Sequence, residues 1–561
     1  CYSAGSVNAG TATSYVGGLA GYIAYTTITN CYYDGVSSGF IPKVTIDLGC
    51  KLTSGMKAEA TFNGWNFSSV WEIDEGVSYP YLKSVAKPSG VSDGLPVNDV
   101  ESGNGTINAP YIINTKEQMN NIKYNIFAHY KLGNNIDLGN EEWIPVGAND
   151  YTPFTGTFDG DGYTVSNLQI NKPTTDYIGL FGYVKDTTIK NITINNVNIV
   201  GRANTGTLIG IADGSSTIQN CLITGMGTLD GKGCVGGLIG RICGGIVTGC
   251  SSTVEVTGSS GSAAGGLIGG CDAEVSKCYA AGNVVNYGEA GGLIGKIGVT
   301  TNRTGSISEC YASGNVSGFS RVGGLIGDFR SSGMTTAKGS DCFALGNVTA
   351  IDTSIPYAGG LIGCCCGGSS SSTYVKLTNC YSAGSVNAGT ATSYVGGLAG
   401  YIAYTTITNC YFDSTITGIS TPENQARTTG QLMQQATFAG WDFSNIWRID
   451  EGMSYPYLVL IQAPIGFTAT NITENQINLS WRSVSDAVKY EIEVDGTVVD
   501  NNLNTSYIHN GLQPGSEHTY RVRAVTSSIT GPWSNSLIVV TLFPGQISVS
   551  LSITETAITA S

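Results

Sequence analysis

Cysteine is the residue of this sequence whose type and spacing are best suited to chemistry. Seven of the sixteen cysteines recur at intervals of 28 to 38 residues. They are Cys221, Cys250, Cys278, Cys310, Cys342, Cys380 and Cys410. Residues at one phase of stacked repeats lie above one another at a distance open to a disulfide, but their side chains point in parallel. Because cysteine also tolerates burial well, we predict a structural ladder of reduced, buried thiols.

A second group of cysteines surrounds the recurring motif GGLIG. It consists of Cys234, Cys243, Cys271 and Cys364 to Cys366. Cys243 and Cys271 follow their GGLIG motifs by three and two residues, which makes them candidates for a disulfide between adjacent repeats. Zinc is the weaker alternative, because paired short cysteine spacings are missing and the chain has only three histidines.

Acidic and histidine residues give little support for catalysis. His129, His509 and His518 stand outside any HExxH or nucleophile motif. The carboxylate pairs are Asp159 with Asp161, Glu141 with Glu142, Asp74 with Glu75, and Asp450 with Glu451. A turn, a strand end and two copies of one cap segment explain these pairs, so we predict no catalytic residue, no metal site and no enzyme. Calcium at Asp159 and Asp161 is the weak alternative, since the EF-hand spacing is missing.

Tyrosine is the remaining candidate for ligand contact. Tyr279, Tyr311, Tyr381 and Tyr411 each follow a ladder cysteine directly. Alternation along a strand turns them to the face opposite the thiols, where they could stack on sugar rings or on another molecule. The competing interpretation, which we favour, is a solvated face with ordinary β-propensity.

A repeated unit must position all these residues. GGLIG stands at Gly236–Gly240, Gly265–Gly269, Gly291–Gly295, Gly323–Gly327 and Gly359–Gly363. Counted with its variants, the steps between central leucines are 26 to 37 residues, a period typical of stacked supersecondary units. Short apolar runs bounded by turns then predict an all-β fold, a capped parallel β-solenoid of about eight coils and roughly 40 Å. We expect the glycines to supply positive φ at a corner and close approach between coils, with Leu and Ile placing one apolar side chain inward.

The segments that break the period predict the domains. The last coils and C-terminal cap of a first solenoid occupy 1–83, a linker 84–104, a second solenoid 105–458, a β-sandwich 463–542 and the start of a further one 543–561. Within the second solenoid we expect an N-terminal cap at 105–165, coils at 166–425 and a C-terminal cap at 426–458.

Sequence signals also predict the caps. Thr115 and Gln118 form a capping-box pattern, and Met119, Ile122 and Ile126 follow at helical spacing, so a short amphipathic helix should cover the first coil. Ala60–Leu82 recurs almost unchanged as Ala436–Leu458, with two tryptophans and a Tyr-Pro-Tyr segment. Both copies should be C-terminal caps.

Charge and hydropathy limit the partners. Charged residues are 12% of the chain and the net charge is −14, which argues against nucleic acid and anionic membranes. The sequence has no apolar run of about 18 residues that would insert into a membrane. Cys1–Tyr32 is identical to Cys380–Tyr411, so we expect the chain to be part of a longer repetitive protein.

The motifs resemble known families. INLSW from Ile477, YEIEVDG from Tyr490 and the Leu-x-Pro-Gly turn before Tyr520 resemble a fibronectin type III module, which implies that Trp481 and Tyr520 are core residues. The GGLIG repeats, the NCYxxGNV tails and the cap resemble the GLUG-motif regions of large bacterial surface proteins.

The GLUG resemblance implies a secreted or cell-surface protein in which the repeats act in adhesion or as a stalk, scaffold or filament component. Some relatives carry a metallopeptidase, whose HExxH is missing here. Expected partners are neighbouring modules of the same protein, further copies in fibres, and cell-wall or plant polysaccharide. The alternative function is a carbohydrate-binding module of an extracellular polysaccharide-degrading system, and no cofactor is expected.

Overall fold

The structure is a computed structural model. It describes residues 2–3, 31–34, 50–51, 61–62, 65–73, 80–83, 103–259, 263–298, 305–331, 336–351, 357–367, 374–389, 394–459, 464, 466–484, 487–525, 533–534 and 537–544. Most of the predicted linker (84–104) and of the predicted further domain (543–561) lies outside these residues.

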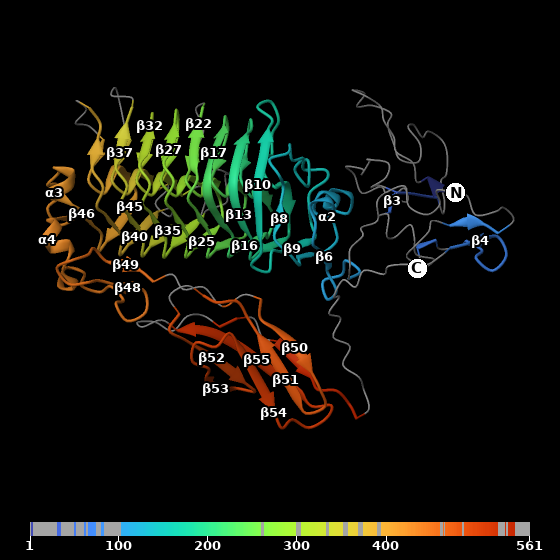
Figure 1. The fold of residues 1–561 in the computed structure, drawn as a ribbon. Helices are drawn as coiled ribbons and strands as arrows, with labels where there is room; N and C mark the ends of the chain where they lie inside the picture. The colour runs from blue at the N-terminus through green and yellow to red at the C-terminus, as the bar shows by residue number, and fades with distance from the viewer. Residues whose placement is uncertain are drawn as a thin grey trace.

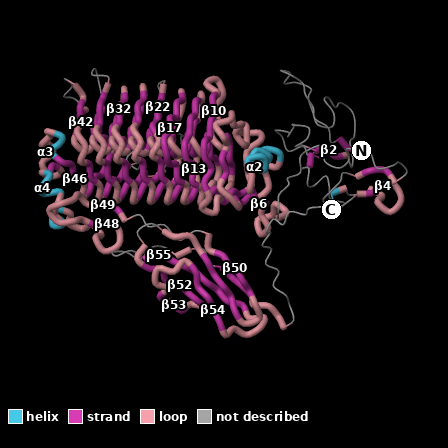
Figure 2. The backbone as a smooth tube through the Cα atoms, in the orientation of Figure 1, coloured by secondary structure: helices cyan, strands magenta, loops and turns pink. Residues whose placement is uncertain are grey.

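The central body is a parallel β-solenoid, as the sequence predicts (Figure 1). Each coil contributes to four parallel sheets, which we number I to IV in the order the chain visits them. A ladder residue separates sheet I from sheet II, and the GGLIG motif separates sheet III from sheet IV. The tube view shows this path repeating from one end of the body to the other, with helices only at its two ends (Figure 2).

The strands of each sheet follow one another at the coil period. Sheet I contains β6 (Tyr111–Ile113), β7 (Tyr130–Leu132), β9 (Thr157–Asp159), β12 (Thr188–Lys190), β16 (Thr217–Gln219), β20 (Ile246–Thr248), β25 (Glu274–Ser276), β30 (Ser306–Ser308), β35 (Ala337–Ser340), β40 (Val375–Thr378) and β45 (Thr405–Thr408). Sheet II begins with β8 (Ile136–Asp137), β10 (Thr164–Asn171), β13 (Thr193–Val200) and β17 (Leu222–Gly231). It then divides into β21 (Ser251–Ser252), β26 (Tyr279–Ala280), β31 (Tyr311–Ala312), β36 (Phe343–Ala344), β41 (Tyr381–Ser382), β46 (Tyr411–Asp413) and β47 (Ala426–Arg427) on one side, and β22 (Glu255–Gly258), β27 (Val284–Asn286), β32 (Val316–Gly318), β37 (Val348–Ala350) and β42 (Val386–Asn387) on the other. Sheet III contains β14 (Thr205–Gly206), β18 (Val235–Gly236), β23 (Ala263–Gly265), β28 (Glu289–Gly291), β33 (Arg321–Gly323), β38 (Tyr357–Gly359) and β43 (Val395–Gly396). Sheet IV contains β11 (Phe181–Lys185), β15 (Ile209–Asp213), β19 (Ile239–Ile242), β24 (Ile268–Cys271), β29 (Ile294–Ile297), β34 (Ile326–Arg330), β39 (Ile362–Cys366) and β44 (Ala399–Ala403).

The GGLIG motif forms the bend between sheets III and IV, and it differs from the prediction in one respect. A Cβ on Gly237 would lie 2.1 Å from the carbonyl oxygen of Gly266 in the next coil, so close approach requires glycine here. The predicted positive φ is wrong, because the described GGLIG glycines are absent from the residues with positive φ. Leu238 and Ile239 are both fully buried, so the motif contributes two core side chains rather than one.

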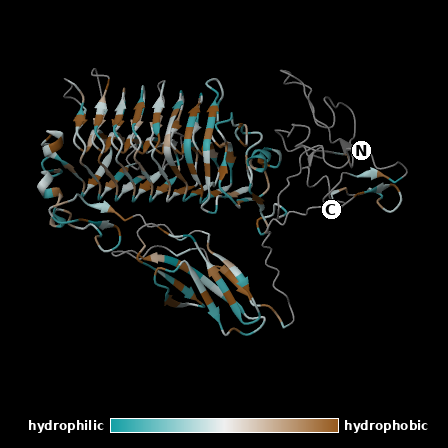
Figure 3. Ribbon diagram, in the orientation of Figure 1, coloured by the Kyte–Doolittle hydropathy of each residue, from teal (hydrophilic) through white to brown (hydrophobic). Residues whose placement is uncertain are grey.

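The interior of the solenoid is one continuous hydrophobic core of stacked Ile, Leu, Val, Ala and Cys side chains. Hydrophobic positions recur at the same place in successive coils (Figure 3). Because every coil repeats the pattern, each coil covers the apolar edge of its neighbour and only the two ends need caps.

The N-terminal cap contains the predicted helix. α2 (Lys116–Asn121) continues into the short 3-10 helix η3 (Ile122–Tyr124). The capping box is formed: the Gln118 backbone N–H donates to Thr115 Oγ1 at 3.2 Å, and the Thr115 N–H donates to Gln118 Oε1 at 3.1 Å. Met119 and Ile122 are fully buried against the first coil. No described helix is long and apolar enough to cross a membrane.

The C-terminal cap consists of α3 (Ser414–Thr417), α4 (Thr429–Leu432), the 3-10 helix η4 (Gln435–Thr437) and the antiparallel pair β48 (Trp447–Arg448) and β49 (Tyr457–Leu458). The described part of residues 1–83 holds β1 (Tyr2–Ser3), β2 (Tyr32–Asp34), β3 (Cys50–Lys51), β4 (Trp71–Glu72) and β5 (Tyr81–Leu82). β4 and β5 pair in the same register as β48 and β49. The two tryptophan rings of each cap are also alike, with centroids 4.3 Å apart for Trp65 and Trp71 and 4.4 Å for Trp441 and Trp447. The described parts of the two cap segments therefore share this strand pairing and this tryptophan contact.

The last described domain is a two-sheet β-sandwich. One sheet contains β50 (Thr468–Ile472), β51 (Gln476–Ser480) and β54 (Ser506–Asn510), and the other contains β52 (Lys489–Val494), β53 (Thr497–Asp500), β55 (Glu517–Val525) and β56 (Leu537–Val540). Trp481 and Tyr520 are buried in its core, as predicted. Arg482 reaches the solenoid, where its guanidinium lies 3.9 Å from the ring centroid of Tyr163.

Candidate functional site

The ladder cysteines form a continuous column inside the solenoid, and all seven are buried and none forms a disulfide. The backbone N–H of Cys250 donates to Cys278 Sγ at 3.4 Å, and the N–H of Cys278 donates to Cys310 Sγ at 3.4 Å. The Cys278 thiol also donates to the Ser276 carbonyl at 3.0 Å. Each sulfur can thus accept from one coil and donate within its own, which an alkyl side chain of similar size cannot do.

The residue before each ladder position supplies the corner that the sequence assigned to GGLIG. These residues have φ between 50° and 64° and are Asn191, Asn220, Gly249, Lys277, Glu309, Asp341, Asn379 and Asn409. Asparagine and glycine tolerate this left-handed conformation, whereas lysine and glutamate rarely adopt it. The signal that could have identified the corner was Asn, Gly or Asp before the ladder residue in six of these eight coils.

Cys243 and Cys271 do not form the expected disulfide. Both carry thiols. Strand pairing places Cys271 opposite Ile242, where both side chains point into the core, while Cys243 comes one residue later and is partly exposed. Cys243 follows the end of β19 and is not the strand partner of Cys271. Burial raises the pKa of the Cys271 thiol to about 12.

The tyrosines that follow the ladder cysteines form a stack along sheet II. Ring centroids are 5.0 Å apart for Tyr279 and Tyr311, 4.8 Å for Tyr311 and Phe343, and 5.1 Å for Phe343 and Tyr381, with planes within 8° of parallel. We call these residues and Tyr411 the aromatic stripe. Parallel stacking at this distance covers the ring faces and leaves mainly the ring edges toward the outside.

The C-terminal cap covers most of the aromatic stripe, so at Tyr381 and Tyr411 both the favoured solvated face and the alternative ligand face are wrong. Tyr381 is 1% exposed and Tyr411 is 8% exposed. The Tyr381 hydroxyl donates to the Pro456 carbonyl at 2.6 Å, and Trp447 Nε1 donates to Asp341 Oδ1 at 3.2 Å. The cap thus folds back over several coils instead of closing only the last one, because the stripe and the cap aromatics bury each other.

Tyr279 and Tyr311 remain half-buried at the uncovered end of the stripe. Lys277 and Glu309, the corner residues beside them, approach each other at 3.8 Å between Nζ and Oε2. Burial raises the pKa of Tyr311 to about 12, so its hydroxyl is neutral near pH 7. This end of the stripe is the only part of the predicted ligand face, within the described residues, that is open to solvent.

The carboxylate pairs have separate structural partners. Asp159 Oδ2 lies 3.2 Å from Lys190 Nζ, and Asp161 Oδ2 lies 3.3 Å from Lys131 Nζ. The Asp161 backbone N–H donates to Asp159 Oδ1 at 2.9 Å, so this pair forms the predicted turn. Glu141 Oε1 likewise lies 2.6 Å from Nζ of Lys116 in α2, and Glu142 Oε1 lies 3.4 Å from Lys172 Nζ. In the second cap, Glu451 accepts from the Gln435 N–H at 3.0 Å. Asp74 and Glu75 of the first cap lie outside the described residues.

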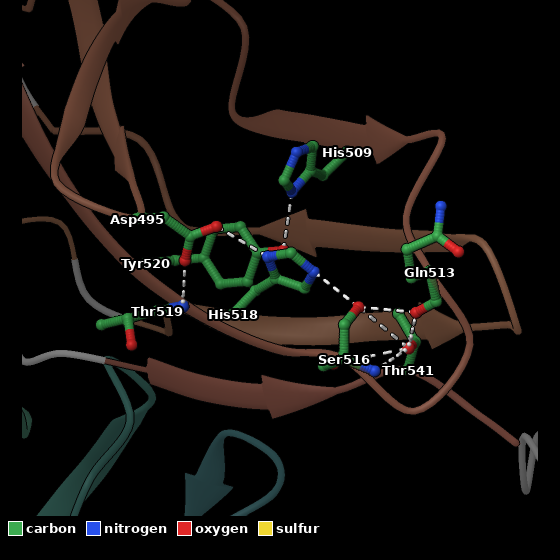
Figure 4. Close-up of polar contacts among 8 residues, drawn as sticks. All are labelled: Asp495, His509, Gln513, Ser516, His518, Thr519, Tyr520 and Thr541. Atoms are coloured by element: carbon green, nitrogen blue, oxygen red, sulfur yellow. Dashed lines mark hydrogen bonds and ion pairs between the residues drawn. The ribbon is translucent and has the colours of Figure 1, made fainter.

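The sandwich holds a polar cluster that sequence reasoning missed (Figure 4). His518 Nδ1 lies 2.6 Å from Asp495 Oδ2, and His518 Nε2 lies 2.8 Å from Ser516 Oγ. Ser516 Oγ also donates to the Gln513 carbonyl at 2.6 Å, so the hydroxyl is engaged with the backbone of the turn. A serine, a histidine and an aspartate are thus in line, but their hydrogen bonds tie the β52–β53 turn to the start of β55. The short Ser-x-His spacing was visible in the sequence, whereas Asp495 comes from another strand pair.

Family comparisons match three segments. The fibronectin type III domain matches residues 462–540, and the GLUG motif matches residues 391–417. The chain carries GLUG and fibronectin type III modules. The N-terminal region of the M26 IgA1-specific metallo-endopeptidases matches residues 110–225, which here form the N-terminal cap and the first coils of the GLUG solenoid.

Curated relatives share parts of the chain. Halomucin of Haloquadratum walsbyi is 35% identical over 164 residues, which are 26% of this chain and 2% of the relative. Chitinase 63 of Streptomyces plicatus is 39% identical over 95 residues, 16% of each protein. A putative Gly-rich membrane protein of Evansella cellulosilytica is 32% identical over 107 residues, 18% of this chain and 12% of the relative. The chain therefore spans only a small part of the length of these relatives.

Solved fibronectin type III domains also match. The domain of human collagen alpha-1(XX) is 16% identical and covers 16% of this chain and 91% of that one, with a TM-score of 0.15. The domain of human contactin 1 is 19% identical and covers 16% of this chain and 82% of that one, with a TM-score of 0.14.

Proposed function

We propose that this chain is a structural, non-enzymatic spacer in a secreted or cell-surface bacterial protein. GLUG and fibronectin type III modules in one chain, and the local identity to halomucin and to Streptomyces chitinases, support an extracellular modular protein. The M26 match is described as an N-terminal region, and we propose that its solenoid segment acts here as scaffold.

The burial of the aromatic stripe carries this proposal. A surface reserved for a ligand would stay open, whereas the cap tryptophans Trp441 and Trp447 pack against Tyr381 with ring centroids 6.3 and 6.2 Å apart. The aromatic residues of the last coils therefore stabilise the end of a rod. A body whose two ends are capped and whose coils are joined by continuous ladders suits a stalk that holds other modules apart.

Neighbouring modules of the same protein are the partners that this role requires, and we include end-to-end association of further copies as a proposal. Electron microscopy of the full-length chain should show a stiff body about 40 Å long in its eight-coil part, attached to a smaller sandwich. Fibres that grow with protein concentration would support self-association. A flexible, beaded chain without a rigid segment would refute the spacer role.

Carbohydrate binding is the second candidate function. The position of Tyr279 at the open end of the aromatic stripe favours it. The stripe ends at this residue, because Ser251 occupies the equivalent position in the preceding coil. One face of the Tyr279 ring is therefore not stacked on another ring of the stripe and could contact a sugar. The test is a glycan array probed with the full chain and with Tyr279→Ser. Binding that this substitution abolishes would favour carbohydrate recognition over the spacer role.

A further inference from the structure

Cys364 and Cys366 lie side by side on the outer face of sheet IV, with their Sγ atoms 2.9 Å apart. Both belong to β39, and the alternation of side chains along the strand directs Cys365 between them into the core. Cys365 is fully buried, whereas Cys366 is partly exposed. The repeat thus places two thiols together that are separate from the buried ladder.

Charged residues of the preceding coil face this pair. Strand pairing sets Asp328 opposite Cys364 and Arg330 opposite Cys366. Arg330 Nε lies 2.8 Å from Asp328 Oδ2, and Arg321 Nε lies 3.8 Å from the same oxygen. Two guanidinium groups and one buried carboxylate therefore lie beside the two thiols, and the arginines oppose the effect of the carboxylate on the charge of a nearby sulfur.

The two thiols have different proton affinities. The hydrogen bond shared with Cys364 lowers the pKa of Cys366, and Arg330 and Arg321 also lower it, whereas burial and the Asp328 carboxylate act in the opposite direction. The same hydrogen bond, with burial, raises the pKa of Cys364. Burial raises the pKa of Cys365 to about 12. Since the thiolate is the nucleophile, Cys366 is the reactive sulfur and Cys364 is the second thiol that can resolve its product.

We propose that Cys364 and Cys366 form a thiol–disulfide exchange site whose substrates are small soluble disulfides. The Cys366 thiolate attacks one sulfur of the external disulfide, the S–S bond breaks, and one thiolate leaves and takes a proton from water. Cys364 then loses its proton to water and attacks Cys366 Sγ, which releases the second thiolate. The protein dithiol is oxidised by two electrons to a disulfide, and the external disulfide is reduced to two thiols.

Strand geometry makes this product reversible. Two residues of a strand span about 6.6 Å between Cα atoms, close to the upper limit of about 6.8 Å for a disulfide. The bond between Cys364 and Cys366 therefore forms at the edge of the usual range and not near its preferred distance, and disulfides away from the preferred geometry are reduced more easily than structural ones. The site suits exchange rather than permanent crosslinking.

The test uses the full-length, fully reduced chain and oxidised glutathione. After timed exposure and acid quenching, remaining thiols are alkylated with N-ethylmaleimide in denaturant, disulfides are reduced, and the new thiols are alkylated with iodoacetamide. Peptide mass spectrometry should find iodoacetamide on Cys364 and Cys366 and N-ethylmaleimide on Cys365 and Cys310. Because Cys366 is partly exposed and Cys310 is fully buried, we expect Cys366 to react at least about tenfold faster than Cys310. Equal rates, or oxidation that spares Cys364 and Cys366, would overturn the proposal.

Variants separate the two roles. Cys364→Ser should accumulate a glutathione mixed disulfide on Cys366, whereas Cys366→Ser should slow the reaction at Cys364 by about tenfold or more. Cys243→Ser, which removes a partly exposed thiol elsewhere on sheet IV, is the matched control and should react like the wild type. Phenylarsine oxide, which bridges two close thiols, should protect the pair only in the wild type and in Cys243→Ser. Unchanged kinetics in Cys366→Ser would refute the assignment of Cys366 as the attacking thiol. The rates measured on the wild-type chain test the proposal independently, even if a variant unfolds partly.

Discussion

A substitution at Gly324 tests the reasoning on which the whole solenoid depends. This residue is the second glycine of a GGLIG motif, and a Cβ built on it would lie 2.2 Å from the Gly360 carbonyl oxygen and 2.9 Å from Ala344 Cβ. A carbon and an oxygen need roughly 3.2 Å, so the two coils must separate locally by about 1 Å. The clash is with backbone, which cannot rotate away as a side chain can.

The magnitude follows from the bonds that hold these coils together. The Leu325 N–H donates to the Leu361 carbonyl at 2.8 Å, and the Gly324 N–H donates to the Gly359 carbonyl at 3.3 Å. A separation of about 1 Å removes both, at about 1 kcal/mol each. Overpacking adds about 1–3 kcal/mol. We therefore expect Gly324→Val to lower the free energy of unfolding by about 3–5 kcal/mol and the melting temperature by roughly 5–10 °C.

Circular dichroism and scanning calorimetry of the full chain would measure this change. Gly324→Ala should cause most of the loss, because the first added carbon makes the contact with Gly360. Gly430→Ala is the control, since a Cβ there would meet nothing within 4 Å and its φ is not positive. If Gly324→Ala melts within about 1 °C of the wild type, the bend has room for a side chain and the explanation of the motif is wrong.

Substitutions at three further positions test the cap, the ladder and the sandwich. Trp447→Ala should destabilise the C-terminal cap by about 3–5 kcal/mol, seen as faster proteolysis within 426–458; unchanged protection would contradict the role of the cap. Cys310→Ala should cost about 1–3 kcal/mol in denaturant unfolding because it leaves the Cys278 N–H without its acceptor, and Cys310→Ser should cost less; the opposite order would contradict a hydrogen-bonding ladder. Burial, with the nearby His518, lowers the pKa of His509, so the unfolded state binds more protons and the sandwich should lose stability as pH falls through about 6.5. His509→Gln should flatten that pH dependence in thermal melts, and an unchanged profile would show that another group causes it.

The coil architecture could be predicted because each coil repeats the same physical constraint. GGLIG marks the place where the backbones of adjacent coils approach closely. The need for glycine there recurs in each coil, whatever the length of its loops. The corner itself was misplaced, because Lys277 and Glu309 adopt a left-handed conformation that their residue types do not suggest. Stacking on neighbouring coils imposes the conformation there, which a local propensity does not reveal.

Contacts between distant segments were the part that could not be predicted. Trp447 meets Asp341 across 106 positions of sequence, and this contact depends on the shape of the folded cap. The polar cluster of Asp495 and His518 likewise arises where separate strands of the sandwich meet. The close thiols of Cys364 and Cys366 were visible as neighbours in the sequence, but their chemistry depends on Asp328 and Arg330 from the preceding coil.

The extent of the aromatic stripe indicates that its role is to pack against the C-terminal cap. The positions after the ladder residue are Leu222 and Ser251 in early coils and Tyr279, Tyr311, Phe343, Tyr381 and Tyr411 in later ones. Trp447 lies 6.0 Å from Phe343 between ring centroids, and Tyr311 packs at the edge of the same cluster. The first cap repeats the arrangement, because Tyr32 meets Phe62 at 5.2 Å and 81° and Tyr411 meets Phe438 at 5.7 Å and 81°. The aromatic stripe thus begins at Tyr279, about one coil before Tyr311, the first stripe residue that packs against the cap cluster. A run of aromatic residues after the ladder positions therefore marks the end of an array in the sequence.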